Sequence, residues 1–86
     1  MAGMEDIHRC TSVLRPLIAE GEPSGIPLAE KAINDLMDAT PGPRQKASLE
    51  SVQAIVQAHR DAAEGSQLRF ADTINDYIEK LMRSFE

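Results

Sequence analysis

The first amphipathic segment of the chain covers residues 4–20, where apolar side chains recur every three or four positions. This spacing places them on one stripe of a helix. Pro16 lies inside the segment and lacks the backbone N–H that would bond to residue 12, so we expect a kink near it. The stripe ends at Gly21, and residues 22–25 then indicate a loop. Its members are Met4, Ile7, Cys10, Val13, Leu14, Leu17 and Ile18.

A second amphipathic segment covers residues 27–39. Its first residue, Pro27, suits the first turn of a helix, because the N–H that proline lacks has no partner there. The sequence Thr-Pro-Gly-Pro at residues 40–43 ends the segment, since prolines and glycine do not continue a helix. The inner face of this helix consists of Ala29, Ala32, Ile33, Leu36 and Met37.

The apolar pattern resumes after residue 43 and continues almost in phase to residue 85, and only Gln67 interrupts the stripe. The helix-breaking pair Gly65-Ser66 lies within this stretch. Gly65 can end one helix while Ser66 caps the next, which gives a helical hairpin. In the alternative, Gly65 lies inside one long helix at a cost of about 1 kcal/mol. We expect the hairpin, because neither glycine nor serine favours a helix interior.

These segments predict an all-α fold, a small antiparallel bundle of four helices in a single domain over residues 1–86. The alternative is a dimer of three-helix chains with a long C-terminal helix. The expected helices cover residues 4–20, 27–39, 43–64 and 67–85.

Two short sequences recur in the same order in both halves of the chain. Ala-Glu-Gly at residues 19–21 recurs at 63–65, and Ile-Asn-Asp at residues 33–35 recurs at 74–76. A duplicated helix–loop–helix explains both recurrences. The alternative is helix-ending chemistry that arose twice, because glycine is a common residue after a helix.

The net charge of the chain disfavours nucleic acid as a partner and favours a basic protein surface. The 86 residues contain nine Lys and Arg against fourteen Asp and Glu, a formal net charge of −5. Residues 1–42 carry three basic and seven acidic side chains, so most of the acidic excess lies in the first half. Nucleic-acid binding depends on clustered cations. We therefore do not expect nucleic acid as the main partner, and we expect a protein with a basic surface instead.

The location is expected to be cytoplasmic. The chain has no run of 18 apolar residues, and its N-terminus has no basic stretch followed by an apolar one, so neither a membrane span nor secretion is predicted. The single cysteine, Cys10, excludes an internal disulfide and a cysteine-based zinc site. No cofactor is expected.

The two histidines, His8 and His59, are the candidate residues for metal binding and for phosphotransfer. Glu5 and His8 have the Glu-x-x-His spacing of di-iron helical bundles, but Val56 occupies the matching position before His59. A metal site is therefore not expected. His59 lies beside the apolar stripe and precedes Arg60, a cation that phosphotransfer would need for the phosphoryl oxygens.

Phosphotransfer at His59 is accordingly the alternative function. Histidine phosphotransfer modules are also small helical bundles, but they place a lysine three residues after the histidine and a glycine next. Here these positions are Ala62 and Ala63. A third hypothesis is nucleic-acid binding through Arg44, Lys46, Arg60 and Arg69.

No other residue pattern predicts catalysis. Cys10 lies on the apolar stripe of its helix, where cysteine behaves as a small hydrophobic residue. The serines do not occur in a nucleophile-elbow sequence, and the glycines do not form a phosphate-binding loop. We expect that the protein is not an enzyme.

The last helix provides the remaining indication of function, because all three aromatic residues of the chain lie between residues 70 and 85. Such a stripe belongs either to the core or to an interface, and aromatic and Met side chains are enriched at interfaces. We predict a non-enzymatic protein that binds other proteins as a regulator, adaptor or accessory subunit and forms a homodimer. The predicted interface consists of Ile74, Tyr77, Ile78, Leu81, Met82 and Phe85.

Overall fold

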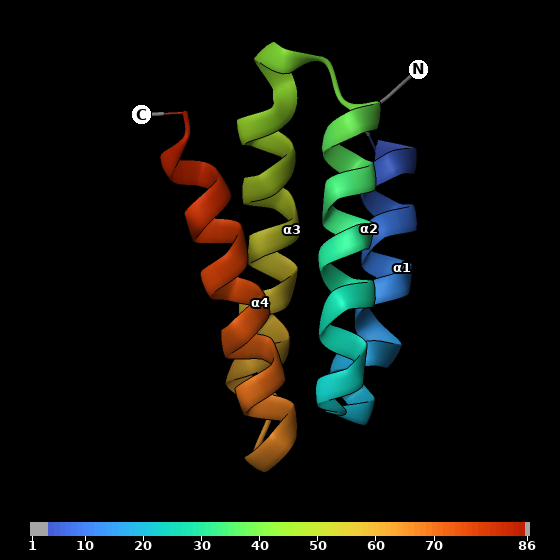
Figure 1. The fold of residues 1–86 in the computed structure, drawn as a ribbon, viewed down its shortest axis with the longest axis vertical. Helices are drawn as coiled ribbons and strands as arrows, with labels where there is room; N and C mark the ends of the chain where they lie inside the picture. Colours follow the sequence, from blue (N-terminus) through green and yellow to red (C-terminus); the bar gives the residue numbers. More distant parts are fainter. Residues whose placement is uncertain (1–3, 86) are drawn as a thin grey trace.

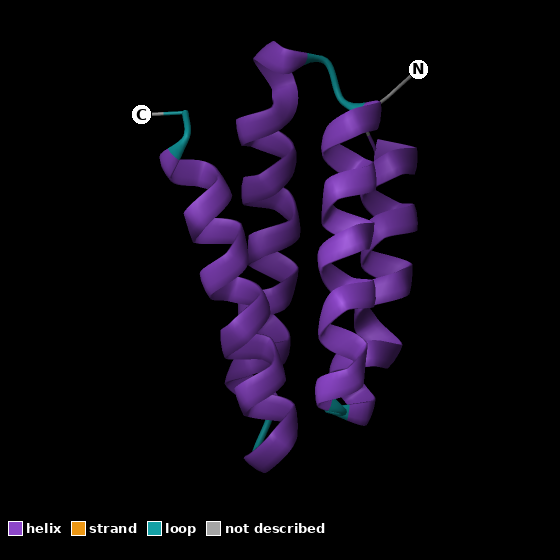
Figure 2. Cartoon of the chain, viewed as in Figure 1, coloured by secondary structure: helices purple, strands orange, loops and turns teal. Residues whose placement is uncertain are grey.

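The computed structural model describes residues 4–85 and shows the expected all-α bundle of four helices (Figures 1 and 2). Residues 1–3 and 86 of the expected domain lie outside the described part. Within residues 4–85 there is no β-strand. The helices are α1 (Met4–Glu20), α2 (Ile26–Ala39), α3 (Gly42–Ala62) and α4 (Gly65–Arg83), and a short 3-10 turn, η1 (Pro23–Gly25), precedes α2.

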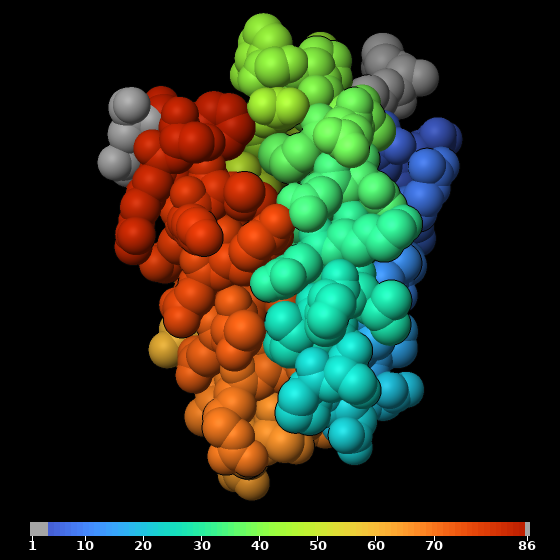
Figure 3. All heavy atoms as spheres, viewed as in Figure 1, coloured from blue at the N-terminus to red at the C-terminus, as the bar shows by residue number. Residues whose placement is uncertain are grey.

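The four helices form two stacked hairpins. α1 packs against α2, and α3 packs against α4; the hairpins then meet through α1 with α3 and through α2 with α4. In Figure 1, α1 and α3 run in one direction while α2 and α4 run in the other. The space-filling view shows α2 and α4 side by side on one face of the molecule (Figure 3). Each hairpin therefore covers one side of the other and leaves its own outer side uncovered.

The chain turns between α3 and α4, which excludes the long C-terminal helix. Ala63 and Glu64 have extended backbones, with ψ values of 156° in both, so the helical path stops there. Gly65 follows with a φ of +60°, a left-handed conformation that glycine adopts without steric cost. Gly65 is the first residue of α4 and Glu64 is its N-cap, so the predicted capping by Ser66 is wrong. At the other hairpin, η1 runs directly into α2, so α2 begins at Ile26 rather than at Pro27.

The core is aliphatic, as the low aromatic content requires. All four helices contribute fully buried side chains, and Phe70 is the one buried aromatic ring among residues 4–85. None of the described helices is long and apolar enough to cross a membrane. The largest side chains without exposed surface are Leu14, Ile33, Leu49, Val52, Val56, Ile74 and Ile78.

Candidate functional site

Part of the predicted interface on the last helix belongs to the core. Ile74 and Ile78 have no exposed surface, because their side of α4 packs into the bundle. The interface prediction therefore fails for these two residues in the folded chain. Tyr77, Leu81 and Met82 are half-buried against the core, and Phe85 is 37% exposed. What remains outside is the C-terminal end of the predicted face.

Tyr77 connects the two hairpins. Its hydroxyl donates a hydrogen bond to Oδ1 of Asn34 on α2, at 2.7 Å. Tyr77→Phe is expected to lower the free energy of unfolding by about 0.5–1 kcal/mol, the usual net value of one such bond. Urea unfolding of Tyr77→Phe, Asn34→Ala and the double variant measures it. If the two single effects simply add, the hydrogen bond contributes nothing to stability.

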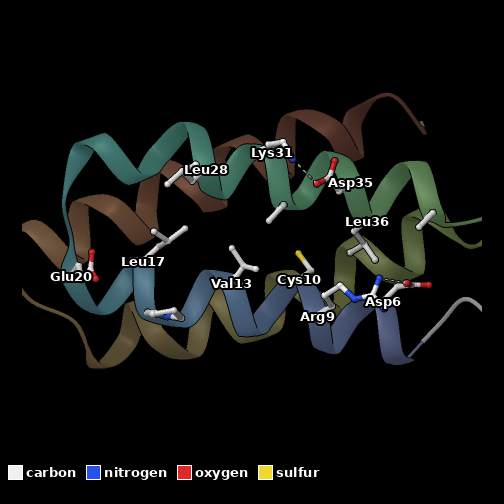
Figure 4. A pocket seen from close by; sticks show the side chains of 13 residues that line it. Asp6, Arg9, Cys10, Val13, Leu17, Glu20, Leu28, Lys31, Asp35 and Leu36 are labelled. Atoms are coloured by element: carbon white, nitrogen blue, oxygen red, sulfur yellow. Dashed lines mark hydrogen bonds and ion pairs between the residues drawn. The ribbon is translucent and has the colours of Figure 1, made fainter.

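A groove with a volume of about 550 Å³ lies between α1 and α2. Figure 4 shows it on the outer side of this hairpin, with α3 and α4 behind. We call it the α1–α2 groove. Its lining residues are Asp6, Arg9, Cys10, Val13, Pro16, Leu17, Glu20, Leu28, Lys31, Ala32, Asp35, Leu36 and Ala39.

The floor and walls of the α1–α2 groove are mainly apolar. Cys10 and Leu36 are buried at the floor, while Val13 on α1 is 42% exposed and Leu28 on α2 is 56% exposed. Figure 4 shows the Val13 and Leu28 side chains on the two opposite walls. Ala32, a half-buried residue of α2, also lines the groove.

Charged side chains surround this apolar channel. Arg9 forms an ion pair with Asp6 at 3.6 Å, and Lys31 forms one with Asp35 at 3.2 Å (Figure 4). Glu20 lies at one end of the groove and forms no ion pair within residues 4–85. Both cations of the rim therefore already have an acidic neighbour, and the rim has one negative charge in excess.

Cys10 is a neutral thiol at physiological pH. Burial, with a smaller effect from the Asp35 carboxylate, raises the pKa of the thiol from its ordinary value of 9.0 to about 11. The thiolate is the reactive form of cysteine, so a thiol with a raised pKa is a poor nucleophile. Its place at the groove floor is consistent with the predicted structural role.

The raised pKa of Cys10 makes stability depend on alkaline pH. The unfolded thiol ionises near pH 9.0 and the folded thiol near 11, so the stabilisation is complete below pH 9.0 and is lost as the pH rises toward 11. We expect the stability difference between wild type and Cys10→Ala to shrink by up to about 2–3 kcal/mol over that range. Urea unfolding of both proteins at stepped pH measures it. A difference independent of pH would contradict the assignment.

The structure separates the residues proposed for the other functions. His59 is half-buried near the end of α3, and the adjacent Arg60 forms an ion pair with Asp72 on α4. The cation on which phosphotransfer would depend is therefore already in an ion pair.

The four cations proposed for nucleic-acid binding do not lie together. Arg44 lies in the first turn of α3, about 24 Å along the helix from Arg60 at 1.5 Å per residue. Lys46 lies near Arg44, and Arg69 near the start of α4, so the four cations divide between opposite ends of the bundle.

No candidate metal centre is found among residues 4–85, because no three His, Cys, Asp or Glu side chains come together there. His8, with the spacing to Glu5 noted above, is exposed on α1.

The apolar pattern of the sequence does not predict the groove. It places Val13 on the stripe of residues 4–20 and Leu28 on no inner face, although both are apolar residues that the structure leaves exposed. A signal was present, since Val13 lies at the edge of its stripe and Leu28 lies beside the inner face of its helix. Comparisons of the chain with protein-family models, with curated protein sequences and with solved structures gave no match, so the function is argued from these residues alone.

Proposed function

We propose that this protein acts by binding another protein, as a regulator, adaptor or accessory subunit, and that it carries out no catalysis. The observation that carries the proposal is the α1–α2 groove, an apolar channel whose walls expose Val13 and Leu28. Exposed apolar side chains that line a groove favour binding of a partner, because apolar surface in contact with water costs free energy that burial by the partner removes. The acidic excess around the groove favours a partner with a basic surface.

Self-association through the C-terminal end of α4 is the second candidate contact. Phe85 is exposed there beside the half-buried Leu81 and Met82, so a homodimer formed at this end would cover an aromatic side chain. Aromatic residues are enriched among the side chains that dominate binding energy. The two candidate contacts use different helices, and single substitutions therefore distinguish them.

The test compares affinity capture by three immobilised proteins, using extract from the native cells. Leu28→Glu places a charge on the groove wall, and Phe85→Glu places one at the end of α4; both side chains are exposed, so both variants are expected to fold, which circular dichroism checks. We expect a protein that wild type and Phe85→Glu retain and that Leu28→Glu loses. Loss with Phe85→Glu alone would move the contact to α4. Equal capture by all three would contradict the proposed function.

A further inference from the structure

We propose that the occupant of the α1–α2 groove is a single amphipathic helix of a partner protein, with an apolar face and basic side chains along its edges. This inference rests on the proposed function and specifies the partner chemistry that the groove accepts. It follows from the length of the groove, the character of its walls and the charges of its rim.

The groove is long enough to take a helix. On α1 the lining extends from Asp6 to Glu20, and on α2 from Leu28 to Ala39. At 1.5 Å per residue these stretches measure about 21 Å and about 17 Å. A partner helix lying along them would present about 11 to 14 residues, with apolar side chains at positions i, i+4, i+7 and i+11.

The walls of the groove provide apolar contacts on both sides of such a helix. Val13 and Pro16 line the groove from α1, and Leu28 and the small Ala32 line it from α2. Helix-in-groove recognition uses this arrangement, because a row of apolar side chains on the ligand is buried between two helices of the receptor. The outer side of the hairpin is therefore a position for a third helix that this chain does not itself supply within residues 4–85.

The rim charges favour a basic helix. The two rim cations, Arg9 and Lys31, are already paired with Asp6 and Asp35, so an acidic partner would compete with existing ion pairs. Glu20 has no ion-pair partner within residues 4–85, and a Lys or Arg on the incoming helix would give it one. Such edge charges steer association and select among partners.

The same charges argue against a second copy of this chain as the occupant. Residues 1–42 contain three basic and seven acidic side chains, a net charge of −4 for the half of the chain that holds the groove. Two copies joined through their α1–α2 grooves would bring these acidic surfaces together, and like charges across an interface disfavour it. Two concave surfaces would also leave the space between them unfilled.

The test uses three lactam-bridged helical peptides of about 14 residues, a length that spans the groove. The first carries Leu at i, i+4, i+7 and i+11 with Lys and Arg at its edges. The second has Glu in place of the basic residues. The third has the composition of the first with its Leu residues distributed over all sides of the helix. Binding is measured by fluorescence anisotropy at two salt concentrations.

We expect the basic amphipathic peptide to bind most tightly and to weaken as salt rises. The other two peptides should bind at least about tenfold more weakly, because the acidic peptide lacks the basic edge charges and the redistributed peptide lacks the apolar face. Leu28→Glu on the protein should also weaken the first peptide by at least about tenfold. Gln57→Glu is the matched control on the exposed side of α3, away from the groove, and should change little. Glu20→Lys should weaken the basic peptide and strengthen the acidic one.

Several results would overturn this inference. Equal binding of the basic and acidic peptides would refute the preference for basic side chains. Equal binding of the basic peptide and the redistributed peptide would refute recognition of an apolar helix face. Failure of all three peptides would refute a helical occupant. A dimer of the free protein that Leu28→Glu dissociates would identify a second copy instead, and Leu28-dependent binding of a fluorescent fatty-acid probe without peptide binding would identify a small apolar ligand. If affinity capture still shows a Leu28-dependent protein, the proposed function stands and only the helical occupant is refuted. If wild type and both variants capture the same proteins, the proposed function itself fails.

Discussion

Replacing Ile74 with alanine is expected to lower the free energy of unfolding by about 3–4 kcal/mol, because the substitution leaves a cavity in the middle of the core. Ile74 has no exposed surface and belongs to the cluster of buried residues that all four helices share. A loss of this size is a large part of the stability of a small domain. Ile74→Val removes a single methylene and should cost about 1 kcal/mol, which keeps the effect measurable if the alanine variant does not fold.

Chemical unfolding of Ile74→Ala, Ile74→Val and Phe85→Ala measures this difference. Phe85 occupies the same helix but is 37% exposed, so its replacement should change the free energy of unfolding by about 0.5 kcal/mol or less. The opposite ranking would show that the side of α4 carrying Ile74 is an interface and not core. The experiment therefore decides between the two roles that the sequence left open for the last helix.

Gly21→Ala is expected to destabilise the protein by about 3 kcal/mol. Gly21 has a φ of +65°, a conformation that costs an alanine about 1–2 kcal/mol. A Cβ atom there would also lie 2.9 Å from the backbone nitrogen of Gln67 and 3.1 Å from its Cα, so the start of α4 would have to move. The close approach of the two hairpin turns requires a residue without a side chain.

Gly65 provides a matched control for this substitution. Its φ is +60°, but no atom lies within 4 Å of the position that its Cβ would occupy. Gly65→Ala should therefore show the backbone strain alone, about 1–2 kcal/mol. The difference between the two variants in thermal or urea unfolding measures the steric contact with α4. Equal losses in Gly21→Ala and Gly65→Ala would contradict the close packing of the turns.

The sequence predicted the helices because their ends carry local chemistry. Proline and glycine between the segments stop helix formation wherever the chain folds next, so the hairpin at Gly65 was predictable without tertiary information. The recurrence of Glu-Gly at both turns also follows from local geometry, since Gly21 and Gly65 both have positive φ values. This shared requirement accounts for the recurrence whether or not the two hairpins have a common origin.

Gln67 interrupts the apolar stripe of the second half, and its role depends on tertiary structure. Its side-chain amide donates to the carbonyl of Ala19, in the last turn of α1. This bond gives a partner to one of the carbonyls that a helix C-terminus leaves unpaired. No pattern within residues 43–86 indicates that contact, because the acceptor is 48 residues earlier in the chain.

The candidate site was harder to predict than the fold for the same reason. An apolar residue on a helix has the same period whether a neighbouring helix or a partner protein covers it. Ile74 was predicted at an interface but has no exposed surface, whereas Val13 was placed on the apolar stripe but is 42% exposed. Within residues 4–85, no further helix covers the outer side of α1 and α2, where the groove lies.

Site-specific photo-crosslinking in the native cells tests the central claim most directly. A photoreactive residue at position 28 would point into the α1–α2 groove, and one at position 57 would lie on the exposed side of α3. We predict a discrete protease-sensitive adduct from position 28 that Val13→Asp on the same chain abolishes, with no such adduct from position 57. Adducts of equal yield at both positions, or none at position 28, would contradict the claim that this groove binds a partner protein.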